Sequence, residues 1–158
     1  MSSSHVLLFA FLIGVIAGLR ALTAPAVTAW AAHLGWLNLH GTPLSFMGSI
    51  ITVVIFTLAA IGELVNDKLP KTPSRLAPGG LVPRILFGGL AGASVAVAGA
   101  QALWLGIVVG IVGCLVGAVA GYQVRMRVVK ALGVKDLYIA LIEDAIAIGG
   151  GLLILSRF

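Results

Sequence analysis

The stretch GELVNDKLPKTPSR, residues 62–75, concentrates charge in a chain of 158 residues that is 60% hydrophobic and 9% charged. It ends a long apolar segment with Glu63 and Asp67, which are four residues apart and therefore share one face of a helix. The part that follows is basic, and its prolines exclude regular helix. Charges beside a membrane helix are costly unless they are solvated, paired or used. This stretch therefore predicts a helix that ends in a loop at a membrane surface.

Apolar runs of about 20 residues recur on both sides of this stretch, and each is long enough to cross a bilayer. A soluble domain of this size would show polar helix faces instead. We therefore expect an all-α, polytopic helical membrane protein that forms a single transmembrane domain over residues 1–158. The single cysteine, Cys114, excludes an internal disulfide. The net charge of +5 is interpreted as a signal for membrane orientation rather than for nucleic-acid binding, because the Lys and Arg residues lie beside the apolar runs.

The hydrophobic pattern predicts about five transmembrane helices. A cleaved signal peptide is the alternative for the first, but no Lys or Arg precedes its apolar core. This first span contains Arg20, and Thr23 and Pro25 follow it, so we expect a polar, kinked segment and a candidate hinge at membrane depth. The predicted spans are residues 6–32, 45–65, 85–100, 103–124 and 137–155.

The positive-inside rule gives the expected orientation, because two of the loops carry almost all of the bases. With five spans, this rule predicts a cytoplasmic N-terminus, in the inner membrane of a bacterium. The first basic loop carries Lys68, Lys71, Arg75 and Arg84, and the second carries Arg125, Arg127, Lys130 and Lys135.

Three segments share the pattern G-x-x-A-G, at residues 14–18, 88–92 and 117–121. Each contains a G-x-x-x-G pair, which is typical of close helix packing and is the simpler interpretation. The first and third segments are followed by an arginine and then by acids in the next span. Because the first and fourth predicted spans would cross in opposite directions, this pattern also suggests an inverted repeat, as in many transporters.

The strings GELVNDKLPKTPSR, GLRALTAPAV and LIEDAIAIGGG together resemble a family of small bacterial membrane proteins known as domain of unknown function 4126. The resemblance spans nearly the whole chain and implies an integral membrane protein without implying an activity. The residues that match its signature are Glu63, Asp67, Lys68, Pro70, Pro73, Ser74 and Arg75.

Arg20 is the most informative single residue, because an unpaired arginine at the bilayer centre costs about 2.5–3.5 kcal/mol on insertion scales. We expect it to meet Glu143 or Asp144 of the last span, as a structural ion pair or as a substrate or proton site. His33 and His40 could be metal ligands, but no Cys, Asp or Glu accompanies them, so they are interpreted as solvated loop histidines. No metal or cofactor is expected, and the chain lacks the common catalytic motifs of an enzyme.

Two functions remain open from the sequence. The first is a small transporter or permease for a small solute or ion, with possible proton coupling. The second is a non-transporting assembly factor, or a protein that binds lipid phosphates. Membrane lipid and a second copy of the chain, as a dimer, are the expected partners. The candidate substrate or ion site comprises Arg20, Glu63, Asp67, Glu143 and Asp144, and the candidate lipid or anion contacts are Lys68, Lys71, Arg75 and Arg84.

Overall fold

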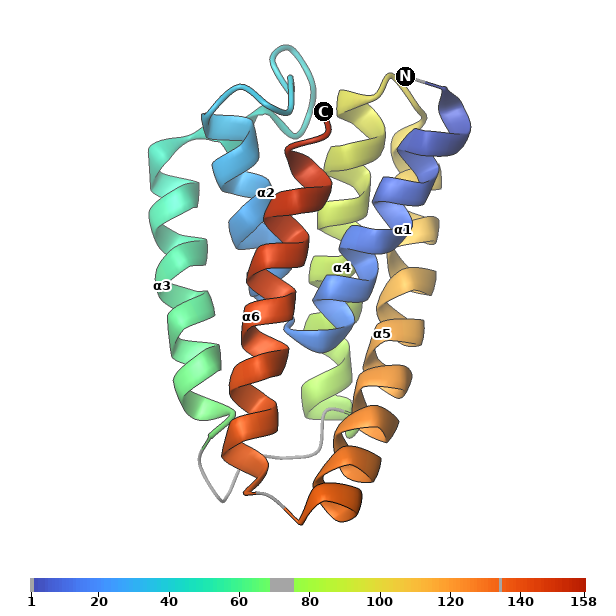
Figure 1. Cartoon of the computed structure of the whole chain (residues 1–158). Coiled ribbons are helices and arrows are strands. Elements are labelled where there is room, and N and C mark those ends of the chain that lie inside the picture. The colour runs from blue at the N-terminus through green and yellow to red at the C-terminus, as the bar shows by residue number, and fades with distance from the viewer. Residues whose placement is uncertain (1, 69–75, 134) are drawn as a thin grey trace.

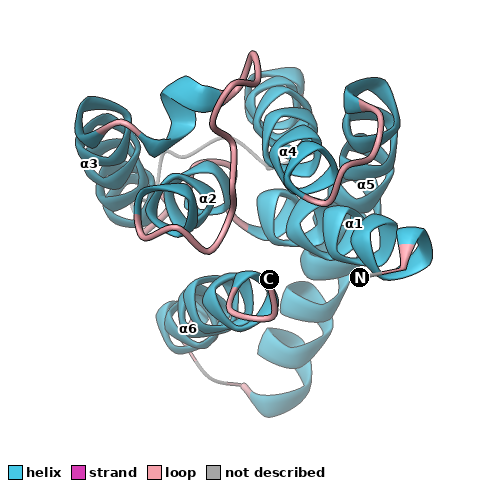
Figure 2. Ribbon diagram, turned by 90° about the horizontal axis from the view of Figure 1, so that it is seen from above, coloured by secondary structure: helices cyan, strands magenta, loops and turns pink. Residues whose placement is uncertain are grey.

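The computed structural model describes residues 2–68, 76–133 and 135–158, and all regular structure within them is helical. Seen along the long axis, α1, α4 and α5 group together, with α2 and α3 beside them and α6 across from α1 and α2 (Figure 2). The elements are α1 (Ser3–Leu19), α2 (Thr23–His33), the short 3-10 helix η1 (Ser45–Gly48), α3 (Ile50–Asn66), α4 (Pro78–Ala98), α5 (Leu103–Leu132) and α6 (Asp136–Leu155).

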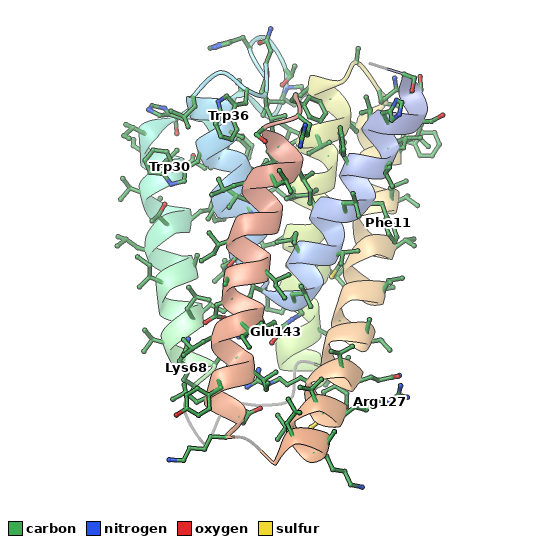
Figure 3. All side chains as sticks on the ribbon, viewed as in Figure 1. Phe11, Trp30, Trp36, Lys68, Arg127 and Glu143 are labelled. Atoms are coloured by element: carbon green, nitrogen blue, oxygen red, sulfur yellow. The ribbon has the colours of Figure 1, made fainter. Side chains whose placement is uncertain are left out.

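Three helices, α4, α5 and α6, are long and apolar enough to cross a membrane, and α1 and α3 are shorter apolar helices. These helices suggest membrane association. In Figure 3, Trp30 and Trp36 lie toward one end of the bundle, and Lys68 and Arg127 lie toward the other. Tryptophans are enriched at membrane–water interfaces and bases in the loops on one side of a membrane, so this separation is typical of membrane proteins.

The predicted first span, residues 6–32, is wrong, because the chain breaks within it. α1 ends at Leu19, Arg20 has extended backbone (φ −140°, ψ 108°), and α2 begins at Thr23. Pro25 does not kink a continuous helix but occupies the first turn of a new one, where its missing N–H removes no helical hydrogen bond. Figure 1 shows that α1 descends to the middle of the bundle and that α2 returns to the end from which α1 came.

This reversal changes the predicted arrangement of the termini. Both termini lie at the end of the bundle opposite the end of α3, the start of α4, the end of α5 and the start of α6 (Figure 1). The sequence-based prediction had placed the N-terminus on the side of the basic loops instead. The reversal also means that α1 and α5 run in the same direction. The inverted relationship predicted between these two segments is therefore absent from the described fold.

The other spans were predicted more closely. α3 begins at Ile50, after η1, and α6 occupies almost the predicted range. α4 begins earlier than predicted, at Pro78, because a proline at the first helical position is tolerated. α5 continues beyond the predicted end to Leu132, where Gly133 takes the left-handed conformation (φ 61°) that commonly ends a helix.

The centre of the bundle is the contact of α5 with α1 and α4. A Cβ added to Gly18 of α1 would overlap the carbonyl oxygen of Cys114 and the amide nitrogen of Ala118. A Cβ added to Gly92 of α4 would likewise overlap the backbone of Gly110. The glycines therefore permit backbone-to-backbone contact within one chain. This contact holds the end of α1, and with it Arg20, inside the protein.

Candidate functional site

The break between α1 and α2 exposes backbone amides in the interior of the bundle, and Glu63 of α3 satisfies two of them. Its two carboxylate oxygens accept hydrogen bonds from Ala21 N–H at 2.8 Å and Leu22 N–H at 2.7 Å. An anion is favoured at the N-terminus of a helix, where the helix dipole is positive. Glu63 therefore acts as a cap for α2 that is supplied by a different helix.

Arg84 of α4 binds the other side of the same break. Its Nε donates to the carbonyl oxygen of Gly18 at 3.1 Å, and its Nη1 donates to that of Gly80 at 2.6 Å. Gly18 belongs to the last turn of α1, whose carbonyl groups attract cations. Nη2 lies 3.9 Å from Glu63. The sequence suggested that Arg84 contacts lipid or an anion, but the structure places it inside the protein, with 6% of its surface exposed.

Arg20 is fully buried at the break and faces three carboxylates. Its Nε donates to Asp144 Oδ1 at 2.6 Å, Nη1 lies 2.5 Å from Asp67 Oδ2, and Nη2 lies 3.7 Å from Glu143 Oε2. The expected contact with the acids of the last span is therefore present. Nη1 and Nη2 make ion pairs but lack the alignment of a hydrogen bond. Nε is the one nitrogen of the guanidinium group that makes both an ion pair and a hydrogen bond.

Two more bases join these acids. Lys68 Nζ lies 2.7 Å from the second oxygen of Asp144. Arg125 of α5 binds Asp136 through two nitrogens, at 2.8 and 2.5 Å, and its Nη1 lies 3.0 Å from Asp67 and 3.4 Å from Glu143. In the sequence-based prediction, Arg125 had only a topological role. The sequence feature that could have indicated this pairing is the short separation of Arg125 from Asp136, which is 11 residues later in the chain.

The resulting charge cluster draws on the four helices α3 to α6, on the break after α1 and on the residues that follow α3. All five acidic residues of the chain belong to it, together with four bases. Lys71 and Arg75, also predicted as anion contacts, lie outside the described residues. The members of the charge cluster are Arg20, Glu63, Asp67, Lys68, Arg84, Arg125, Asp136, Glu143 and Asp144.

Asp67 follows the last residue of α3 and is the acid shared by Arg20 and Arg125. Burial alone would raise the pKa of this carboxyl group. The two guanidinium groups outweigh that effect and lower its pKa below the ordinary value of 3.8. Asp67 is therefore ionised at neutral pH.

Two cavities lie at opposite ends of α2. The inner cavity, of about 380 Å³, is bordered by Ala21 and Leu22 at the start of α2 and by charged members of the cluster, Glu63, Asp67 and Arg84. The outer cavity, of about 400 Å³, is bordered by Ala32 and His33 at the end of α2. Between them, the Thr23 hydroxyl is buried and has no hydrogen-bond partner. In the part of the chain that the structure describes, no three or more His, Cys, Asp or Glu side chains are grouped so that they could hold a metal ion.

Together, the helices and the buried charges define a protein whose described residues form a helical bundle, with a helix pair that reverses direction inside it and an internal cluster of paired charges. The chain belongs to the family described as Domain of unknown function (DUF4126), whose family model matches residues 7–156. No curated protein and no solved structure matches the chain.

Proposed function

We propose that this protein is a small membrane transporter or permease for a small solute or ion, and that its pathway follows α2. The observation that carries the proposal is the pair of cavities at the two ends of this short helix. α2 has 11 residues and is therefore about 16 Å long, roughly half the thickness of the hydrocarbon core. A solute that enters either cavity has only this distance left to cross.

The helix break supports the same proposal. Irregular backbone at membrane depth is tolerated where it is buried in protein or lines a cavity, and transporters place discontinuous helices at their binding sites. Here the break at residues 20–22 borders the inner cavity, and Glu63 occupies the N-terminus of α2. The turn, together with Thr23 and Pro25, is the candidate hinge.

The charge cluster supplies groups that could bind and respond to a solute. Glu143 and Asp144 are adjacent, and both are more than nine-tenths buried. Arg20 pairs with both of them. An anionic group of a solute that approached Arg20 would compete with Glu143 and Asp144 for its guanidinium. Movement of a proton together with the solute is therefore included in the proposal.

The proposal includes an orientation and a partner. If the basic connections face the cytoplasm of a bacterium, both termini face outward, which reverses the orientation predicted for the N-terminus. In this arrangement α3, α4, α5 and α6 cross the inner membrane, and α1 and α2 form a re-entrant pair. Four spans enclose little space, so we propose a homo-oligomer, with a dimer favoured.

The test is flux into proteoliposomes that contain the purified full-length chain, under an imposed pH gradient, screened over small anions and cations. Wild type should move at least one solute, and Glu63→Gln and Glu143→Gln should each abolish that flux. Lys130→Gln is the matched control, because Lys130 is exposed near the end of α5 and is not a member of the charge cluster. Absence of flux in wild type, or full flux in both folded cluster variants, would contradict transport.

A second function is favoured by a different observation. Arg127, Lys130 and Lys135 are exposed at the basic end of the bundle, where they could bind lipid phosphates or support the assembly of a partner. In that case the charge cluster would serve only to join the helices. Co-purified phospholipid phosphate that is lost when these three bases are neutralised, in a protein that moves no solute, would favour this function.

A further inference from the structure

The outer cavity brings together two residues that the function proposed above does not use. His33 at the end of α2 and His40 of the following loop both border this cavity of about 400 Å³. The chain has only three histidines, and the third, His5, is in the first turn of α1. From the sequence, a shared metal site was the weaker interpretation of these two histidines, which are seven residues apart.

The ring of His33 is held by two neighbours. Its Nδ1 lies 2.9 Å from the carbonyl oxygen of Gly48, and its ring makes a T-shaped contact with the ring of Trp30, with centroids 6.2 Å apart and an interplanar angle of 83°. A carbonyl oxygen only accepts, so Nδ1 carries the hydrogen and donates it, which leaves a lone pair on Nε2. Metal-ligating histidines characteristically donate their other ring N–H to a backbone carbonyl in this way.

We propose that His33 and His40 bind a divalent transition-metal ion in the outer cavity, with water completing the coordination. Imidazole nitrogen suits Zn²⁺, Ni²⁺ and Cu²⁺, whereas Mg²⁺ and Ca²⁺ require oxygen ligands such as carboxylates. The residues that border the cavity include no acid: they are Ala32, His33, Leu39, His40, Ser45, Gly48 and Ser49. The site is therefore specific for the borderline metals. It stands independently of transport, since it needs only the two rings and the cavity.

Trp30 provides the measurement, because Ni²⁺ quenches the fluorescence of a nearby indole. The protein is the full-length chain without a histidine tag, with Trp36→Phe and Trp104→Phe, so that Trp30 is the only tryptophan. Titration with Ni²⁺ should give saturable quenching. Zn²⁺ should reverse it by competition, and Mg²⁺ at the same concentration should not.

Three variants separate this site from other sources of binding. His33→Asn and His40→Asn should each raise the apparent Kd for Ni²⁺ at least tenfold, and His5→Asn should leave it unchanged. His40 lies in an exposed loop, so its variant remains informative if His33→Asn fails to fold. Quenching that does not saturate, that is unchanged in His40→Asn, or that is lost in His5→Asn would overturn the proposal.

Discussion

At the scale of single residues, the structure is organised by the pairing of charges in a place where water is scarce. Arg20 lies in the helix break and pairs with Asp144 of α6, and Arg84 of α4 donates to the carbonyl group of Gly18 beside the break. Glu63 accepts hydrogen bonds from the two backbone amides that follow Arg20 in the break. A buried charge that loses its partner is costly, so these residues should be strongly coupled in stability.

The first prediction concerns the pair Arg20 and Asp144. Arg20→Gln and Asp144→Asn should each lower the free energy of unfolding by about 3–5 kcal/mol, because each leaves the partner's charge buried and unpaired. The double variant should lose less than the sum, with a coupling of about 0.5–3 kcal/mol. Thermal unfolding of the four proteins in detergent measures this coupling. Strictly additive losses would show that the contact contributes no energy of its own.

The second prediction concerns pH and Asp67. Because the folded protein lowers the pKa of Asp67 below 3.8, ionised Asp67 stabilises the fold above that pH. The stabilisation should be lost as the pH falls through the lowered pKa of the folded state. Wild type should therefore be more stable than Asp67→Asn at pH 7, and the difference should shrink below pH 3.8. A difference in melting temperature that stays constant from pH 7 to pH 3 would contradict this role.

At the scale of elements, close helix contact depends on glycines that are used within the chain. Gly18 faces the backbone of α5 without room for a side chain, whereas a Cβ added to Gly149 of α6 would meet nothing within 4 Å. These two glycines lie in helices and differ in their surroundings. They therefore form a matched pair for testing the packing of α1 on α5.

The third prediction is that Gly18→Leu destabilises the protein and Gly149→Leu does not. The new side chain at position 18 would collide with backbone that cannot rotate away, which should cost about 3 kcal/mol or more. The change should be visible as a lower melting temperature, or as loss of the monodisperse peak in size-exclusion chromatography. Equal behaviour of the two variants would show that α1 and α5 are not held together at this point.

The sequence predicted the helical class, the approximate limits of α3 and α6, and the meeting of Arg20 with Asp144. It did not predict the break after Leu19, because hydrophobicity is continuous across residues 6–32 and a proline in the first turn of a helix resembles one that kinks a helix. It also missed the role of Arg125, whose pairing with Asp67 joins residues 58 positions apart. Such a contact depends on how the helices are arranged in space, and local sequence patterns do not specify that arrangement.

At the scale of the whole molecule, the proposed topology depends on the α1–α2 pair, which would decide which parts of the chain share a side of the membrane. A continuous first span would place Ser4 and Asn38 on opposite sides. The observed fold places the N-terminus and the loop after α2 at the same end, with the end of α5 at the other (Figure 1). The two topologies therefore differ in a property that can be measured without knowing the function.

The fourth prediction tests this difference with single cysteines in a Cys114→Ala background. Ser4, Asn38 and Lys130 are exposed, so substitution at these positions should leave the fold intact. Ser4→Cys and Asn38→Cys should react with a membrane-impermeant thiol reagent from the outer face of intact cells, because the chain turns back at residues 20–22. Lys130→Cys should react only after the membrane is opened, since bases are retained on the inner face. Labelling of Ser4→Cys and Asn38→Cys from opposite faces would restore a continuous first span. The helix break beside the inner cavity would then be absent, and the pathway proposed along α2 would lose its basis.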